Sequence, residues 1–225
     1  DFFGIQMLSS LDISRRNLAL RGKEIFEKVI RMAEYAREEI NQIGGYYAYG
    51  KEICNGDSIY DFDITKLSVH TREIGLAGIE VYDLLRDEYD IQIEFGDLGN
   101  ILAYLSIGDR PRDIERLVSA LSEVRRRFEG PSVGLLSQEY IEPKVIVSPQ
   151  TAFYAEKESL PLKESAGRVC SEFVMCYPPG IPILAPGEKI TEEILEYIVY
   201  AKDKGCSMTG PEDPDIERLN VLKGV

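Results

Sequence analysis

The chain has 225 residues, of which 44% are hydrophobic, so it is long enough for one large domain or two small ones with a buried core. Its formal net charge of −13 argues against nucleic acid or an anionic membrane surface as a partner, because the field of the protein would repel phosphate. No apolar stretch is long enough to span a bilayer and no signal peptide is recognisable, so we expect a soluble, cytoplasmic protein.

The first 130 residues predict a small domain of the α+β class. A helix is expected over 18–43, where apolar residues return every three or four positions, and Gly44-Gly45 should end it. Further helices are expected over 78–89 and from Pro111 to about 128, behind a cap at Asp109. The expected strands are 46–50, 66–70, 91–95 and 100–107, in a mostly antiparallel sheet.

A second domain is expected after a linker at 131–142, where the composition shifts toward Gly, Ser, Gln and Glu. This domain, residues 143–225, should contain β-rich runs at 144–147 and 169–175 and a final strand near 219–222. A helix should begin after a Thr191 cap and end at Gly205.

The cysteines and the histidine do not predict a metal centre. Four cysteines are spread without a C-x-x-C pair, and the single histidine is His70. A structural zinc site usually needs four such ligands at close spacing. We therefore expect free thiols and no bound metal.

The segment YPPGIPILAPGE, residues 177–188, has unusually restricted backbone angles. Proline holds φ near −65° and glycine permits positive φ, so the segment can present its groups in a fixed geometry. We expect Tyr177, Pro178, Pro179 and Gly180 to form a wall of a binding site. A stiff crossover with a purely structural role is the alternative.

Two carboxylates stand at either end of this part of the chain. Glu172 stands at the end of the apolar part of a β-like run and Glu188 follows Pro186-Gly187, so the two side chains could converge on a cationic ligand through charge-assisted hydrogen bonds. The alternative is structural. Glu188 would then accept hydrogen bonds from neighbouring backbone N–H groups, and Glu172 would face solvent.

The longest motif, SPQTAFYAEKESLPLKESAGRVCSEFVMCYPPGIPILAPGEKITEEILEYI at 148–198, resembles the C-terminal domain of the Orn/Lys/Arg decarboxylases, which are pyridoxal-phosphate enzymes of fold type I. GPED at 210–213 fits the same pattern. Residues 9–24, 60–69 and 73–102 resemble the part that follows the cofactor-binding large domain. The resemblance is closest to the arginine decarboxylases of Gram-positive type, although lysine and ornithine enzymes share most of these motifs.

The resemblance implies an enzyme of at least two identical subunits that releases carbon dioxide from a basic amino acid and yields a polyamine or its precursor. In that family a lysine in a Ser/Thr-His-Lys context holds pyridoxal phosphate as a Schiff base, and the protein orients the substrate and binds its cationic tail. The resemblance also implies a small domain of the aminotransferase-like kind, followed by an α/β C-terminal domain.

No stretch of this sequence matches the cofactor lysine of the family. We therefore expect the missing large domain to bind the cofactor, no catalytic residue within this chain, and no activity from the chain alone. Substrate contacts are expected from Glu172, Glu188 and the residues at 177–180. The alternative is a non-catalytic binding or regulatory module that pairs with full-length decarboxylase subunits.

Overall fold

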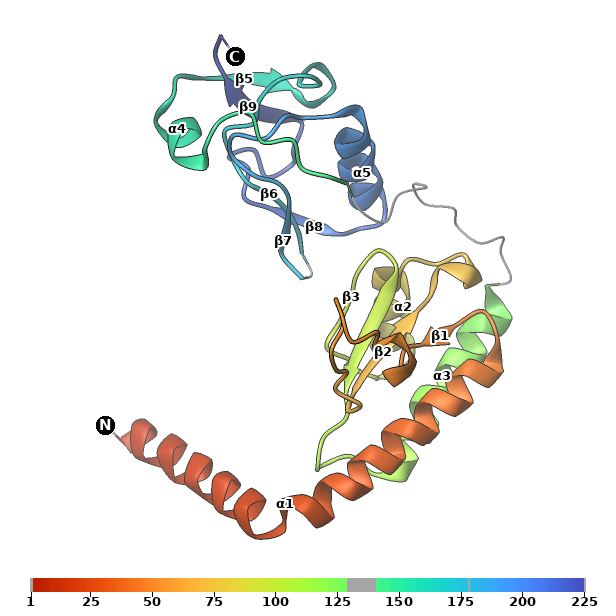
Figure 1. Cartoon of the computed structure of the whole chain (residues 1–225). Coiled ribbons are helices and arrows are strands. Elements are labelled where there is room, and N and C mark those ends of the chain that lie inside the picture. Colours follow the sequence, from red (N-terminus) through yellow and green to blue (C-terminus); the bar gives the residue numbers. More distant parts are fainter. Residues whose placement is uncertain (1, 129–140, 178, 225) are drawn as a thin grey trace. The chain divides into compact units, whose positions relative to one another are not determined.

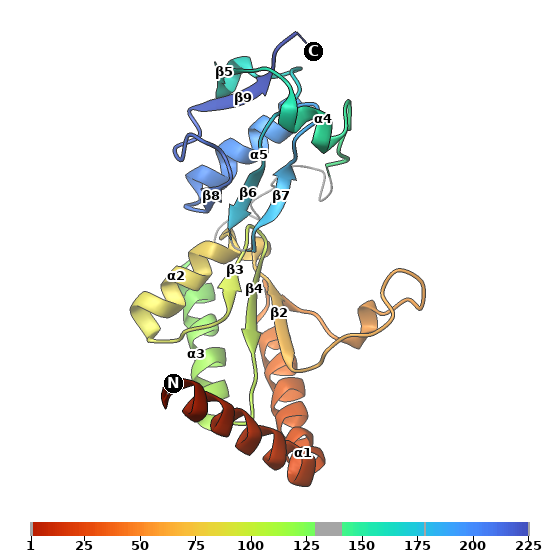
Figure 2. The same cartoon turned by 90° about the vertical axis from the view of Figure 1, so that its left-hand side faces the viewer.

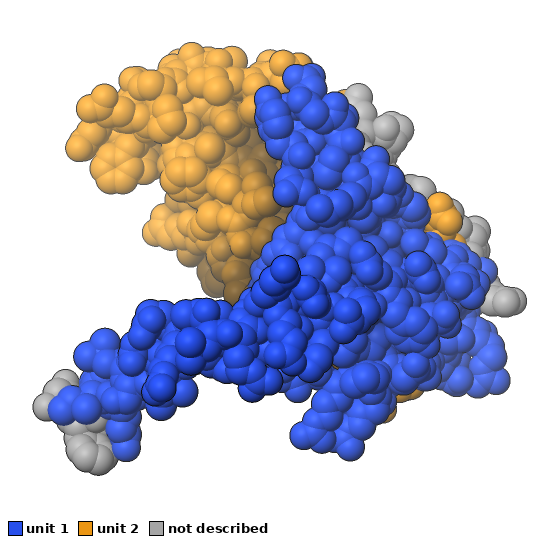
Figure 3. Space-filling model, turned by 60° about the horizontal axis from the view of Figure 1, so that its bottom comes forward, with its two compact units in different colours: residues 1–70, 102–127 blue, residues 71–101, 128–225 orange. Residues whose placement is uncertain are grey.

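The computed structural model describes residues 2–128, 141–177 and 179–224. By contacts the chain divides into two compact units, one of Asp1–His70 with Leu102–Arg127 and one of Thr71–Ile101 with Phe128–Val225 (Figure 3). The expected linker at 131–142 lies almost wholly outside the described residues, so the domain boundaries at 130 and 143 stay a prediction.

The described elements are helices mixed with short strands that pair mostly in antiparallel fashion, which confirms the α+β class (Figure 1). The helices are α1 Phe2–Ile43, α2 Gly78–Tyr89, α3 Pro111–Arg127, α4 Pro149–Tyr154 and α5 Glu192–Asp203, with 3₁₀ turns η1 Lys51–Ile53, η2 Arg72–Ile74 and η3 Leu162–Glu164. The strands are β1 Tyr47–Ala48, β2 Lys66–His70, β3 Phe95–Gly96, β4 Asn100–Tyr104, β5 Lys157–Pro161, β6 Val174–Tyr177, β7 Ile181–Leu184, β8 Ser207–Thr209 and β9 Arg218–Leu222. They form sheets ordered β1-β2-β4-β3, β5-β9 and β7-β6-β8.

The first unit is built on the packing of α1 against α3, which lie side by side in Figures 1 and 2. The second half of α1 buries Val29, Ala33, Ala36 and Ile40, which recur at the spacing of one helix face. From α3 the buried side chains are Ile114, Leu117, Ala120, Leu121 and Val124. Gly44 and Gly45, with φ of 78° and 76°, end α1 where the sequence predicted.

A buried cation ties α1 to the sheet of this unit. The Arg37 side chain is only 6% exposed. Its guanidinium donates to the backbone carbonyls of Tyr49, Ala33 (3.2 Å) and Lys66 (2.9 Å). Burial lowers the pKa of Arg37, and the nearby negative charge of Glu52 opposes this. Arg37 therefore joins its own helix to the segments that contain Tyr49 and Lys66.

Replacing Arg37 with leucine should destabilise this unit by about 2–4 kcal/mol, because the partly buried carbonyls of Tyr49 and Lys66 would lose their donor. The measurement is the free energy of unfolding from urea denaturation followed by circular dichroism. Arg31→Leu is the matched control, because Arg31 is an exposed residue of the same helix and should change stability by less than about 0.5 kcal/mol. Equal effects of the two substitutions would contradict the proposed role of Arg37.

The second unit has its core around α5. This helix begins after Thr191, whose Oγ1 accepts the Ile194 N–H at 3.3 Å, and it buries Ile194, Leu195, Ile198 and Ala201. The same core holds buried residues from the strands and loops around it, including Val174, Leu184, Ile190, Ile216, Leu219 and Val221. Strands β5 and β9 pair antiparallel beside it. The C-terminal region thus has a continuous apolar core.

In the second unit, α2 begins with its backbone against the β3–β4 turn. The Ile79 N–H donates to the Asp97 carbonyl at 2.8 Å, and the Asp97 carboxylate accepts the N–H groups of Gly99 and Asn100 at 2.7 Å each. Gly78 allows this approach, because a Cβ there would lie 1.9 Å from the Asn100 carbonyl oxygen. The position tolerates no side chain.

Several predicted elements need correction. Helix α1 begins at Phe2 rather than at 18, because residues 5–20 have good helix propensity although both faces of this part are exposed. Of the strand expected at 91–95 only Phe95 is in β3, since Gln92 instead bonds the Ile93 carbonyl and Tyr82. The run at 144–147 makes only an isolated bridge between Val145 and Glu188.

Candidate functional site

The wall predicted at 177–188 is a β-hairpin in the second unit. Strands β6 and β7 pair antiparallel, and Val174 and Leu184, both fully buried, anchor their far ends in the core. At the near end, Tyr177 is 56% and Ile181 is 68% exposed. The hairpin thus has an anchored base and an exposed apolar tip.

The tip has the restricted geometry that its sequence predicts. Gly180 has a φ of 90°, a conformation that favours glycine, and its N–H donates to the Cys176 carbonyl at 2.8 Å. Tyr177 Cδ2 lies 3.4 Å from the place of a Gly180 Cβ, so the ring packs against this turn. Pro179 is exposed, and Pro178 lies outside the described residues. The candidate residues Tyr177, Pro179 and Gly180 are therefore together on one surface.

The second turn of this segment contains Glu188. Its carboxylate accepts the Ala185 N–H at 2.9 Å, while the Glu188 N–H donates to the Ala185 carbonyl. Gly187 in this turn has a φ of 93° and lies against residues that precede α4, since a Cβ there would be 2.2 Å from the Val147 carbonyl oxygen. Glu188 thus has the backbone contact expected of a structural carboxylate.

The Glu172 carboxylate is bound to the C-terminal part of the chain. It accepts the backbone N–H of Asn220 at 2.8 Å and that of Glu212 at 3.1 Å. Asn220 Nδ2 donates to Glu172 at 3.2 Å and to the Glu212 carboxylate at 2.8 Å. Glu172 is half-buried, so a cationic ligand would have to share it with these donors.

Cys170 contacts the backbone of both candidate glutamates, and its N–H donates to the Glu188 carbonyl at 2.8 Å. Its thiol donates to the Glu172 carbonyl at 3.1 Å. Burial raises the pKa of Cys170 to about 12, and the charges of Glu172 and Glu188 both add to the rise. Both carboxylates therefore lie near one buried thiol, and the substrate role assigned to them stays a prediction.

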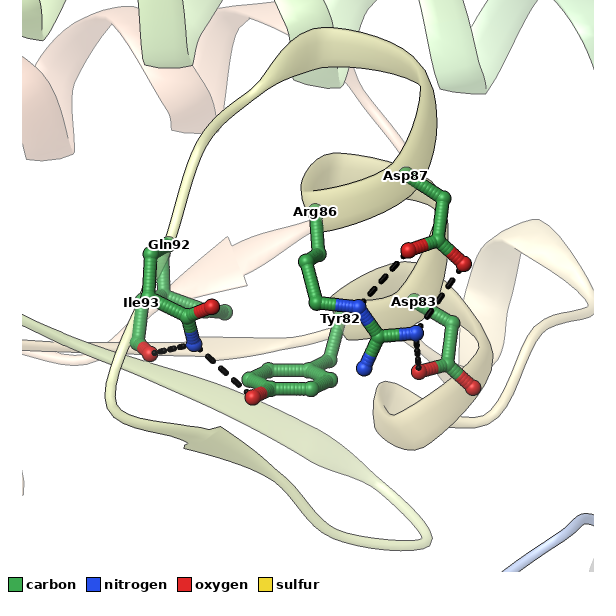
Figure 4. Close-up of polar contacts among 6 residues, drawn as sticks. All are labelled: Tyr82, Asp83, Arg86, Asp87, Gln92 and Ile93. Atoms are coloured by element: carbon green, nitrogen blue, oxygen red, sulfur yellow. Dashed lines mark hydrogen bonds and ion pairs between the residues drawn. The ribbon is translucent and has the colours of Figure 1, made fainter.

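Another polar group of the second unit lies at the end of α2 (Figure 4). Arg86 pairs with Asp83 at 2.9 Å and with Asp87 at 2.7 Å, and the hydrogen bond to Asp87 is the main reason that the Arg86 pKa is raised. Its guanidinium also lies 5.4 Å from the centre of the Tyr82 ring. Because two carboxylates already neutralise it, Arg86 is poorly suited to receive a substrate anion.

The structure also bears on ligand classes. Within the described residues, no three His, Cys, Asp or Glu side chains come together as metal ligands would. None of the described helices has the length and apolar character needed to cross a bilayer.

An open apolar groove of about 500 Å³ runs along α5 and contains none of the candidate residues. It is lined by Leu162, Lys163, Glu192, Leu195, Glu196, Val199, Tyr200 and Asp203.

Sequence reasoning missed Asn220 and Glu212 as partners of Glu172. The only available signal was the GPED motif at 210–213, which places Glu212 directly after a Gly-Pro turn. Gly210 has a φ of 106°, and a Cβ there would lie 2.5 Å from the Phe173 carbonyl oxygen. The motif thus sets the close approach that brings Glu212 to Glu172.

Comparison with known proteins gives the relatives of the chain. Residues 136–213 match the family described as Orn/Lys/Arg decarboxylase, C-terminal domain. The chain is 40% identical over 220 residues to an arginine decarboxylase of Bacillus subtilis (strain 168), and 41% identical over 223 residues to an arginine decarboxylase of Halalkalibacterium halodurans. Each match covers 96% of this chain but 45% of the relative, so the chain spans less than half the length of these relatives.

Solved structures show the same fold. A lysine decarboxylase of Francisella novicida superposes on 90% of this chain and 40% of its own, with a TM-score of 0.64 and 19% identity. The constitutive lysine decarboxylase of Escherichia coli superposes on 90% of this chain and 41% of its own, with a TM-score of 0.62 and 18% identity. These likenesses confirm the expected α+β fold.

Proposed function

The chain belongs to the Orn/Lys/Arg decarboxylase family, and from this premise we propose that it forms the C-terminal part of a pyridoxal-phosphate-dependent arginine decarboxylase. The observation that carries the proposal is the 40% identity to the Bacillus subtilis arginine decarboxylase over 96% of this chain. Lysine and ornithine are the alternative substrates, since the description of the matched family names both and a lysine decarboxylase of Escherichia coli is 27% identical over 176 residues. The product would be a polyamine or its precursor, made in the cytoplasm.

The described residues do not fit pyridoxal phosphate, which needs a lysine for its Schiff base. Lys204 is paired with Glu80 at 2.9 Å, and the Lys66 ammonium lies 3.3 Å from the centre of the Tyr104 ring. Lys202 donates to a backbone carbonyl, and the other described lysines are exposed. We therefore assign the cofactor lysine to residues outside this sequence and expect no activity from the chain alone.

The first half of α1 has an exposed apolar surface, which supports a contact with further protein partners. It exposes a set of large apolar side chains, namely Ile5, Met7, Leu8, Leu11, Ile13, Leu18 and Leu20, each at least 41% exposed. An apolar surface of this kind marks a contact with another protein part. We propose that the cofactor domain of the same enzyme and a second identical subunit are the partners.

A second candidate function is a non-catalytic module that pairs with full-length decarboxylase subunits. The observation that favours it is the misfit between the described lysines and the cofactor. The two candidates differ in one property: only the enzyme part should yield carbon dioxide when it is joined to a cofactor domain.

The substrate role of Glu172 is tested in a complete enzyme, made by joining this chain to the part of the Bacillus subtilis relative that lies outside the match. Glu172→Gln should raise the KM for arginine about tenfold or more, because one charge-assisted hydrogen bond to the cationic tail would be lost. The measurement is steady-state release of carbon dioxide. Glu212→Gln is the matched control, since it removes the neighbouring charge but leaves Glu172 intact. An unchanged KM in Glu172→Gln would remove this residue from the substrate site.

A further inference from the structure

Two cysteines of the second unit share one buried cluster. Cys176 is in β6 and is 7% exposed, while Cys206 lies between α5 and β8 and is 6% exposed. The cluster also contains Ala77, Ile79, Leu98 and Ala201. Neither thiol has a part in the proposed function.

Strand register places the two side chains on one face. Strands β6 and β8 pair antiparallel with Cys176 opposite Met208. Residues two apart along an extended chain point to the same side, so Cys206 faces the side that Cys176 occupies. The two side chains also belong to the same buried cluster, and the interaction between the thiols shifts the pKa of each.

We propose that Cys176 and Cys206 are a redox-active dithiol, which a small disulfide oxidant converts into an intramolecular disulfide that joins β6 to the segment after α5. Bond formation requires the two sulfurs to approach to about 2.05 Å. The Cys206 N–H donates to the Ala201 carbonyl at 3.0 Å, so the approach has to come mainly from rotation of the two side chains.

The environment decides which sulfur reacts first. The hydrogen bond from Cys206 lowers the pKa of Cys176, although burial and the charge of Asp97 oppose this. The same hydrogen bond, together with burial and the charges of Asp97 and Asp83, raises the pKa of Cys206. The direction of these shifts favours Cys176 as the attacking thiolate and Cys206 as the resolving thiol.

The reaction balances with one molecule of oxidant. The Cys176 thiolate attacks one sulfur of oxidised glutathione, forms a mixed disulfide and releases one glutathione thiolate. Cys206 then loses its proton, attacks the Cys176 sulfur and releases the second glutathione. Two protein thiols are oxidised, and one oxidised glutathione is reduced to two thiols.

The disulfide would bear on the candidate site, since Tyr177 directly follows Cys176 at the exposed tip of the hairpin. This consequence rests on the proposed function, whereas the cross-link itself does not.

The other two thiols serve as internal controls. Cys170 is fully buried with a raised pKa, and Cys54 is partly exposed in the first unit.

The test is to treat the native protein with oxidised glutathione, then unfold it in denaturant with excess alkylating reagent so that every remaining thiol is alkylated, and map the peptides by mass spectrometry without reduction. We expect a Cys176–Cys206 cross-linked peptide, a glutathione adduct at Cys54 and an alkylated Cys170. Cys206→Ser should stop at a mixed disulfide on Cys176, and Cys176→Ser should leave Cys206 alkylated. Absence of the cross-linked peptide in the unmutated protein, while Cys54 carries glutathione, would overturn the proposal whether or not either variant folds.

Discussion

Replacing Gly78 with alanine is expected to unfold the second unit or to destabilise it by at least about 3 kcal/mol, the upper end of the usual cost of overpacking. The new Cβ would lie 1.9 Å from the Asn100 carbonyl oxygen and 2.7 Å from that of Asp97. Both obstacles are backbone atoms, so no side-chain rotation relieves the clash. The α2 start would have to leave the β3–β4 turn and give up the Ile79–Asp97 hydrogen bond.

The measurement for Gly78→Ala is urea denaturation combined with the labelling rate of the buried thiols Cys170 and Cys206, which report on the second unit. Gly22→Ala is the matched control. Gly22 lies inside α1 with 4.0 Å to the nearest side-chain atom, so alanine there should stabilise the helix by about 0.5–1 kcal/mol. Unchanged thiol labelling in Gly78→Ala would contradict the close packing of α2.

Gly187→Ala is expected to cause a second large loss of stability, and it should also displace residues of the candidate site. The residue has a φ of 93°, and its Cβ would meet the Val147 carbonyl oxygen at 2.2 Å. The strained backbone costs about 1–3 kcal/mol, and the contact adds about as much again. Because Gly187 N–H donates to Cys170 and its carbonyl accepts from Val147, the turn that holds Glu188 would shift.

Gly167→Ala separates the two contributions. Gly167 has a φ of 80°, but nothing lies within 4 Å of the place of its Cβ. Alanine there should therefore destabilise the protein only through the strained backbone conformation. Urea denaturation should show a larger loss for Gly187→Ala, and arginine decarboxylation by the complete enzyme should fall in that variant alone. Equal losses of stability in the two variants would show that the contact with Val147 is unimportant.

The parts of the fold that sequence reasoning predicted are those with local signals. The capped helix after Thr191 and the helix at 78–89 have the expected bounds within one or two residues, because caps and helical periodicity are read within a few positions. Gly180 and Gly187 have the positive φ that their Pro-Gly context suggested. The strand expected at 91–95 was wrong, because apolar alternation also occurs in a loop held by Gln92.

The parts that it missed depend on contacts between distant residues. Nothing local in the sequence links Glu172 to Asn220, yet this contact decides what the carboxylate binds. The two thiols of the Cys176–Cys206 pair are likewise brought together by the pairing of β6 with β8. Short strands such as β5 and β8 were not predicted, because their residues have mixed polarity and no alternating pattern.

The most direct test of the account is release of carbon dioxide from arginine by this chain alone and by this chain joined to the part of the Bacillus subtilis arginine decarboxylase outside the match, each supplied with pyridoxal phosphate. We expect no release from the chain alone and release from the joined protein, with the visible absorbance of a bound Schiff base in the joined protein only. Release of carbon dioxide by the chain alone, or a folded joined protein that binds pyridoxal phosphate but leaves arginine unchanged, would contradict it.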